Sequence, residues 1–191
     1  MDGPAGLFKL LVLALLMSAR IRASVAVAAT RALFAAGWTT PRKMAASTWE
    51  QRTGTLNKSG YARYDERTST MIADTTQLLL DDYGGDLRRL RAAARKDPVE
   101  ERALLTRFKG VGDIGVDIFF RDAQRVWPEL RPFADQRALT GAQQLGHGTS
   151  ARDLAELVNG DDLPRLLSAL VPIDLEGTAD EIVPDYSRNS R

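Results

Sequence analysis

The feature of the sequence that most constrains the fold is a glycine–valine–glycine step inside a helical stretch. Residues 104–120 read LLTRFKGVGDIGVDIFF, so two glycines flank one valine between two apolar runs. Glycine weakens a helix interior and lets the backbone turn tightly. The segment therefore predicts two helices joined by a short turn. The inner face of the first helix is expected to consist of Leu104, Leu105 and Phe108. Ile118 and Phe119 form that of the second, and Val111 fills the gap between them.

Helical signals also fill the rest of the chain, and no window shows the sustained alternation that is typical of strands. Asp97 can cap a helix whose first residue is Pro98, which makes a strong helix start. Further helices are expected at residues 7–19, 23–36, 68–83, 86–96, 136–145, 151–158 and 163–170. The sequence thus predicts an all-α, two-lobed protein. The first lobe is expected at residues 1–126 and includes a hairpin at about 98–126, and a smaller lobe follows at 127–175. Residues 176–191 are predicted to be a disordered tail.

Composition excludes several kinds of site. The 191 residues, 44% of them hydrophobic and 27% charged, have the balance of an ordinary globular protein. The chain has no cysteine, which excludes disulfides, thiolate zinc sites and cysteine-ligated iron–sulfur clusters. A single histidine, His147, disfavours a histidine-based metal site. Because the formal charge is only +1, any binding of nucleic acid must come from a local basic face.

The apolar run LFKLLVLALLMSA, at residues 7–19, has two interpretations. It could be the apolar region of a signal peptide, with AVA at residues 26–28 as a cleavage pattern. Against this, Asp2 precedes the run and Lys9 interrupts it, and the run is too short to cross a membrane. We therefore expect a buried helix, while export or membrane association stays open as an alternative.

The predicted turn is also a candidate site for a phosphate group. It would be too tight for a side chain at either Gly110 or Gly112, and it would expose backbone N–H groups at the start of the second helix. Such a turn contacts the DNA backbone and not the bases, so it binds without reading sequence. Lys109 would face the phosphate. A purely structural turn would have the same sequence, and that alternative stays open here.

Three stretches elsewhere follow the order of segments in one protein family: LLMSAR at residues 15–20, GYARYDERTSTMI at 60–72 and RPFADQRAL at 131–139. With the glycine turn, they make residues 7–146 resemble the helix-hairpin-helix DNA glycosylase superfamily, the endonuclease III-like enzymes of base-excision repair. The resemblance implies binding of double-stranded DNA that carries a lesion. It also implies an aspartate at the head of a helix after the hairpin, and Asp135 is in that place.

The family's chemistry gives Asp135 a catalytic role. Breaking an N-glycosidic bond passes through a cation-like sugar, which a carboxylate can stabilise while it orients or deprotonates a water molecule. The alternative is that Asp135 only caps the helix that begins at Gln136. The two roles are compatible.

Two residues depart from the family pattern. Members that also cut the strand carry a lysine at the second position after the last glycine of the hairpin, and here that residue is Ile114. Since an apolar side chain cannot form a Schiff base, the resemblance implies a monofunctional enzyme that uses water. Asp113 is acidic where relatives have a basic or neutral residue, which would weaken phosphate binding.

The resemblance implies further site residues. Arg20 would be the wedge that fills the gap left by a flipped base, although a solvated arginine would look the same. Tyr61, Tyr64 and Trp127 are candidates for the base pocket, or for the core. The expected DNA contacts are Lys109, Gly110, Val111, Gly112 and Arg20, and the carbonyl groups of Thr106, Phe108 and Val111 could hold a monovalent cation. No other cofactor is expected.

These observations predict a monofunctional DNA glycosylase that excises a damaged or mismatched base and leaves an abasic site. We expect a monomer in the cytoplasm, associated with the nucleoid and not with a membrane, whose DNA site lies between the two lobes. The alternatives are a non-catalytic helix-hairpin-helix DNA-binding protein and an exported or membrane-associated helical protein.

Overall fold

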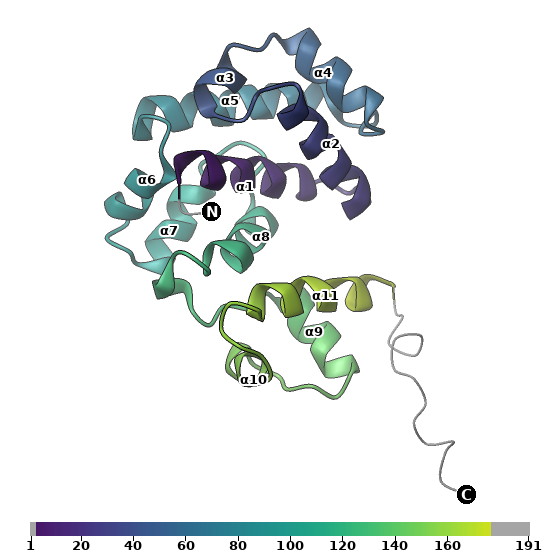
Figure 1. The fold of residues 1–191 in the computed structure, drawn as a ribbon, viewed down its shortest axis with the longest axis vertical. Helices are drawn as coiled ribbons and strands as arrows, with labels where there is room; N and C mark the ends of the chain where they lie inside the picture. Colours follow the sequence, from purple (N-terminus) through teal and green to yellow (C-terminus); the bar gives the residue numbers. More distant parts are fainter. Residues whose placement is uncertain (1–2, 177–191) are drawn as a thin grey trace, which may run out of the picture. The chain divides into compact units, whose positions relative to one another are not determined.

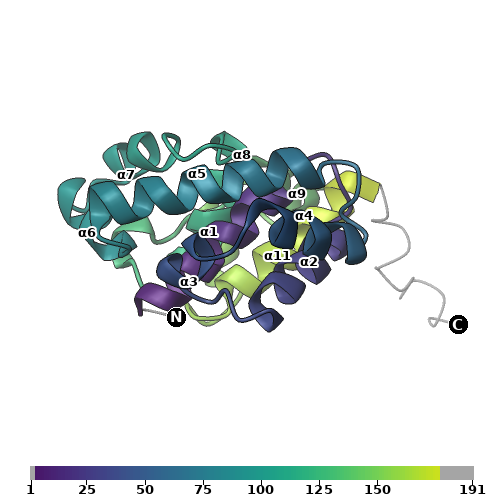
Figure 2. The same ribbon diagram turned by 90° about the horizontal axis from the view of Figure 1, so that it is seen from above.

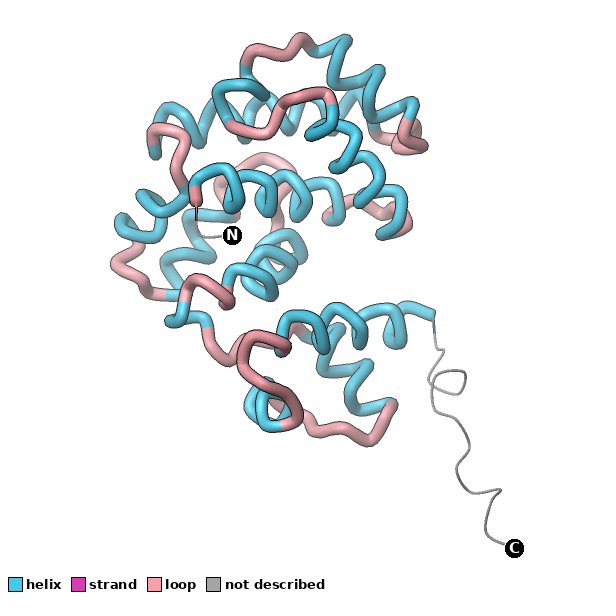
Figure 3. Tube along the Cα trace, in the orientation of Figure 1, coloured by secondary structure: helices cyan, strands magenta, loops and turns pink. Residues whose placement is uncertain are grey.

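The computed structural model describes residues 3–176, and in that part of the chain helices are the only regular secondary structure (Figures 1 and 3). The all-α prediction is therefore confirmed. The chain divides into two compact units, the first ending at Phe119 and the second beginning at Phe120. This division lies inside a helix, whereas the sequence placed the boundary between lobes at residues 126 and 127.

The first unit is built from the following helices: α1 (Pro4–Met17), α2 (Ala23–Ala35), α3 (Pro41–Ala45), α4 (Trp49–Lys58), α5 (Asp65–Tyr83), α6 (Leu87–Ala93), α7 (Pro98–Leu105) and most of α8 (Asp113–Ala123). The second unit contains the end of α8, a 3₁₀ helix η1 (Pro128–Leu130), α9 (Gln136–Gln144), α10 (Ala151–Glu156) and α11 (Leu163–Glu176).

Helix α1 is the central core element of the first unit. Its buried residues are Leu7, Phe8, Leu10, Leu11, Val12, Ala14, Leu15 and Leu16. Lys9, the charge that interrupts the apolar run, is exposed and places its Nζ 5.6 Å from the centroid of the Phe34 ring. The expected buried helix at the N-terminus is thus confirmed, because apolar burial around nearly the whole helix is what such a run needs in water.

Helices α3 and α4 pack on the long helix α5, while α2 packs on α1 and α4 (Figures 1 and 2). The sequence analysis did not predict α3 or α4. Helix α4 is polar and short, so its periodicity is weak, but Thr48 and Gln51 form a capping box that marks its start.

Polar contacts fix the connection between α4 and α5. Asn57 Nδ2 donates to Asp65 Oδ2 (2.8 Å), and Asp65 Oδ1 accepts from the backbone N–H of Glu66 (2.8 Å). The hydroxyl group of Tyr61 donates to the carbonyl oxygen of Leu16 (2.8 Å). These contacts hold the tyrosine-containing connection against the C-terminal end of α1.

In the second unit, α9 packs mainly against α11. Their shared core consists of Ala138, Ala142, Leu154, Leu163, Leu167 and Leu170. Leu167 and Leu170 anchor helix α11 in this core, and the helix continues through Pro172 to Glu176, beyond the predicted end at residue 170. Of the predicted tail, residues 177–191 lie outside the described part of the chain.

No helix within residues 3–176 is both long enough and apolar enough to cross a membrane.

Candidate functional site

The turn between α7 and α8 is held against α5. The backbone N–H of Val111 donates to the carbonyl oxygen of Phe108 (3.0 Å), and Thr75 Oγ1 donates to the carbonyl oxygen of Lys109 (3.0 Å). The structure buries five of the six predicted inward residues, Leu105, Phe108, Val111, Ile118 and Phe119, whereas Leu104 is only half-buried. The turn is therefore a fixed part of the first unit.

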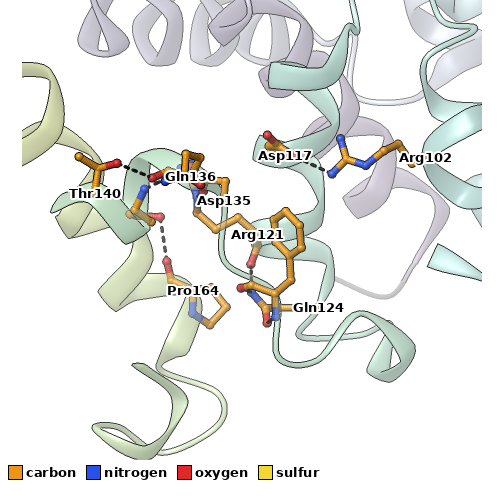
Figure 4. Close-up of polar contacts among 11 residues, drawn as sticks. Arg102, Asp117, Arg121, Gln124, Asp135, Gln136, Thr140 and Pro164 are labelled. Carbon is orange, nitrogen blue, oxygen red and sulfur yellow. Dashed lines mark hydrogen bonds and ion pairs between the residues drawn. The ribbon is translucent and has the colours of Figure 1, made fainter. Parts of the chain in front are cut away.

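An ion pair joins the two helices beside this turn. Arg102 of α7 places Nη2 2.6 Å from Asp117 Oδ1 of α8 (Figure 4). Arg102 Nη1 also lies 3.8 Å from Asp113 Oδ1, although the Asp113 side chain is 86% exposed. The negative charge of Asp113 thus projects into solvent and is only weakly paired.

The glycines of the turn have different roles. Gly110 has a φ of +84°, and a Cβ there would lie 2.9 Å from Met71 Sδ and 3.2 Å from Leu15 Cγ. Gly112 has no positive φ, and a Cβ there would meet no atom within 4 Å, so the prediction that both positions exclude a side chain is wrong for Gly112. Gly115, which the sequence analysis overlooked, approaches α1 so closely that a Cβ would lie 2.6 Å from Ser18 Oγ.

We predict opposite outcomes for alanine at the two glycines of the motif. Gly110→Ala should lower the free energy of unfolding by about 2 kcal/mol, because it combines a left-handed backbone with overpacking against Met71. Gly112→Ala, the matched control, should change it by less than about 0.5 kcal/mol. Urea denaturation of both variants measures the difference, and equal losses would contradict the assigned roles.

The N-terminus of α8 presents unused hydrogen-bond donors. The backbone N–H groups of Gly112, Asp113 and Ile114 have no acceptor among the residues that the structure describes. Ile114 is 45% exposed. A helix N-terminus with free N–H groups favours an anion, since the helix dipole adds partial positive charge there.

A cavity of about 330 Å³ adjoins this turn, and we name it the turn pocket. It is lined by the end of α1 and the residues after it (Leu15, Ser18, Ala19, Arg20), by the start of α5 and the residues before it (Tyr61, Tyr64, Arg67, Thr68, Met71), and by Gly110. The pocket thus brings together four residues predicted for the site from three distant segments: Arg20, Tyr61, Tyr64 and Gly110.

The rim of the turn pocket is cationic. Arg20 and Arg67 are exposed, and neither guanidinium group makes an ion pair or hydrogen bond within the described residues. The Arg63 guanidinium carbon lies 5.4 Å from the centroid of the Tyr64 ring. No carboxylate belongs to the lining, and the acids nearest in sequence, Asp65 and Glu66, are outside it.

The two tyrosines of the pocket differ in availability. Tyr61 is completely buried, and its hydroxyl group is already bonded to Leu16. Burial raises the pKa of Tyr61, so the neutral phenol persists and Tyr61 acts as a rigid wall. Tyr64 is half-buried, which leaves part of its surface for a ligand.

Lys109 is on the same turn but is already paired. Its Nζ lies 2.8 Å from Asp74 Oδ2, and the two side chains are 70% and 41% exposed. A pair with this much exposure is weak and exchanges readily with solvent. Contact between Lys109 and a phosphate group stays a prediction.

Asp135, the predicted catalytic residue, is buried in the second unit. Its Oδ2 accepts from Arg121 Nη2 (2.6 Å) and Nε (2.9 Å), and its Oδ1 accepts from the backbone N–H of Ala138 (3.3 Å). Both residues are labelled in Figure 4. The side chains of Arg121 and Asp135 are 7% and 3% exposed. Asp135 therefore caps α9, as the alternative interpretation holds, and also forms a buried ion pair that the sequence did not indicate.

Gln124 fixes the segment before Asp135. Its Nε2 donates to the carbonyl oxygens of Phe133 (3.0 Å) and Arg121 (2.9 Å), while its Oε1 accepts from the backbone N–H of Phe133 (3.1 Å). Arg131 Nε donates to the carbonyl oxygen of Gln124. The end of α8 thus determines where the carboxylate of Asp135 lies.

Asp122, next to Arg121 on α8, is a second carboxyl group in this region. Burial raises the pKa of Asp122, and the charges of Arg125 and Arg121 oppose that rise. Its Oδ1 lies 3.9 Å from Arg125 Nη2. Within the described residues, no hydrogen bond or ion pair joins Asp122 to the α9 cap or to the segment that Gln124 holds.

The other residues predicted for the site do not form a second site in the described part of the chain. Trp127 belongs to the second unit, is fully buried and does not line the turn pocket. Of the carbonyl groups suggested for a monovalent cation at Thr106, Phe108 and Val111, that of Phe108 accepts the Val111 N–H. The cation stays a prediction. Within residues 3–176, no three acidic or histidine side chains gather where they could hold a metal ion.

Four residues at these sites were not predicted from the sequence: Arg67, Thr68, Arg121 and Gln124. Arg67 could have been found, because it lies only three residues after Tyr64 in the same tyrosine-containing stretch. Arg121 and Gln124 carry no local signal, since their partners belong to a loop whose conformation the sequence did not specify.

No protein-family model, curated protein or solved structure matches this chain.

Proposed function

We propose that this protein is a monofunctional DNA glycosylase that binds lesion-containing duplex DNA at the α7–α8 turn, as a helix-hairpin-helix protein does. The observation that carries the proposal is the turn pocket. Arg20, Tyr61, Tyr64 and Gly110, predicted from separate motifs, all line one cavity next to the free N–H groups of α8.

Each part of this region matches one requirement of base excision. The N–H groups at Gly112 and Asp113 can donate to a phosphate oxygen, with Lys109 and Arg20 supplying positive charge. Ligand pockets in proteins start at about 300 Å³, so the turn pocket, at about 330 Å³, suits a group as small as one nucleobase. An enzyme that acts on a base must first take it out of the helical stack, and Tyr64 offers an aromatic surface to receive it.

Asp135 is proposed to act on the sugar of the extruded nucleotide. The sugar gains positive charge as the glycosidic bond breaks, and a fixed carboxylate stabilises that charge without reorganising. Arg121 holds the carboxylate in one position, and Gln124 holds the backbone of Phe133 just before it. A carboxylate that is already in place is the preorganisation that such a role requires.

Ile114 determines the proposed outcome of the reaction. Because its exposed side chain has no amine, we predict that borohydride added during turnover will trap no covalent adduct between protein and DNA. Ile114→Lys, prepared in parallel, tests whether an amine at this position forms an adduct. Trapping with the wild-type protein would contradict the water mechanism and would assign the nucleophile to another amine.

A specific observation favours a second candidate function, a DNA-binding protein without catalysis. Both oxygens of Asp135 already accept hydrogen bonds, and its side chain is 3% exposed. A carboxylate held in this way can serve stability alone. In that case the turn and the pocket would recognise altered DNA without cutting the glycosidic bond.

One experiment separates the two candidates. Duplexes of one sequence, each with a single uracil, thymine glycol, 8-oxoguanine or 7-methylguanine, are incubated with the full-length protein and then treated with alkali. Strand breaks at a lesion position in excess of those in the same duplex treated with alkali without protein report an abasic site and support the glycosylase. Tight binding of a lesion duplex without any break supports the second candidate, and equal weak binding of all duplexes contradicts both.

A further inference from the structure

We infer that the turn pocket selects a neutral base rich in carbonyl groups and rejects a base that carries a positive charge. This inference names the substrate class of the proposed site and rests on the proposal that a flipped base enters the pocket. The proposal of base excision does not say whether the excised base is charged, and this inference adds that property.

The inference starts from the charged groups of the lining. Arg20 and Arg67 bring two guanidinium groups with no protein acceptor in the described part of the chain. No aspartate or glutamate lines the cavity. A purine alkylated at a ring nitrogen bears a formal positive charge, so it would meet like charge with no carboxylate to compensate it.

The helix beside the pocket strengthens the same preference. Free N–H groups at Gly112, Asp113 and Ile114 mark the positive end of the α8 dipole. Gly110, which lines the pocket, is two residues before Gly112 on this turn. The arginine side chains and the backbone amides thus both favour a neutral or negative group, although the exposed Asp113 carboxylate in the first turn of α8 offsets part of the helix dipole.

The polar groups of the lining are suited to carbonyl oxygens. Guanidinium groups can only donate hydrogen bonds, and the Tyr64 hydroxyl group can donate as well. Uracil, thymine and their oxidised derivatives present carbonyl oxygens as acceptors. The apolar part of the lining, Leu15 and Met71, suits the face of a neutral ring.

The test compares two bases of the same shape that differ in charge. Duplexes of identical sequence carry either 7-methylguanine, which is cationic, or 7-methyl-7-deazaguanine, its neutral isostere, and a third duplex carries uracil. Affinity is measured by fluorescence anisotropy at one fixed salt concentration. We expect the neutral isostere to bind about fivefold or more tightly than the cationic base, the size of one like-charge contact in water.

The second part of the test reverses one charge in the lining of the pocket. Arg67→Glu should shift the neutral-to-cationic affinity ratio by about tenfold or more toward the cationic base. Arg22→Glu is the matched control, because Arg22 is exposed and close in sequence to Arg20 but does not line the pocket. It should weaken binding of all three duplexes alike and leave the ratio unchanged.

The outcomes distinguish this inference from the proposed function. If the wild-type protein prefers 7-methylguanine to its neutral isostere, or if Arg67→Glu leaves the ratio unchanged, the inference is overturned while base excision can still hold. If alkali reveals no abasic site in any duplex but the affinity ratio follows the expected order, the proposed glycosylase activity is refuted. The inferred charge selectivity of the pocket is then still supported.

Discussion

Replacing Arg121 with methionine is expected to lower the free energy of unfolding by about 3–5 kcal/mol. Methionine preserves much of the apolar volume but leaves the Asp135 carboxylate without its guanidinium partner at a site with 3% exposure. A buried charge without compensation is among the most destabilising changes that one substitution can cause. Since a domain of this kind is stable by about 5–15 kcal/mol, urea denaturation will show a large shift.

Two further variants establish the cause of that loss. Arg165→Met removes an arginine whose side chain is 77% exposed and whose ion pair with Asp162 has a distance of 3.4 Å, so it should change stability by less than about 1 kcal/mol. Arg121→Met combined with Asp135→Asn removes both charges and should be more stable than Arg121→Met alone. If Arg121→Met costs no more than Arg165→Met, the buried ion pair does not stabilise the second unit.

Asp135→Asn is expected to lower the rate of base release by at least about 10²-fold. Asparagine keeps an oxygen that can cap α9, so the substitution mainly removes the negative charge that would stabilise the sugar cation. The rate is measured under single-turnover conditions, with the duplex that the wild-type protein cleaves most rapidly. The affinity for that duplex should change little, because the turn pocket does not include Asp135.

The control for this result addresses the ion pair. Asp135→Asn leaves Arg121 without a carboxylate, so a loss of activity could reflect a loss of structure. The double variant Arg121→Met/Asp135→Asn removes that imbalance, and it should regain stability without regaining activity. Equal rates of base release for wild type and Asp135→Asn would show that Asp135 only caps α9.

The sequence was sufficient for the helices whose signals are local. The apolar run of α1, Asp97 and Pro98 at the start of α7, and the glycine step before α8 each have a signal within one or two turns. Helix α3 was missed because it has only five residues, and α4 because it is polar and has too few apolar residues to show a helical period; only the Thr48–Gln51 capping box marks α4. Propensity is weak for such elements, and packing on α5 determines them.

Part of the candidate site could likewise be predicted from the sequence, and part could not. Arg20, Tyr61, Tyr64 and Gly110 were proposed from motif order, and they line one cavity. The environment of Asp135 could not be predicted, because its ion pair with Arg121 depends on how the segment after η1 returns to α8. Gly112 was misjudged since a glycine in the sequence shows that a side chain is absent but not that one is excluded.

The most direct test of the account is to find where a flipped base lies. A duplex with one 5-iodouracil, bound to Asp135→Asn so that the base is retained, is irradiated, and the cross-linked peptide is identified by mass spectrometry. We predict attachment at Tyr64, the half-buried aromatic side chain of the turn pocket. Attachment only at residues outside that lining would contradict the central claim that this cavity receives the base.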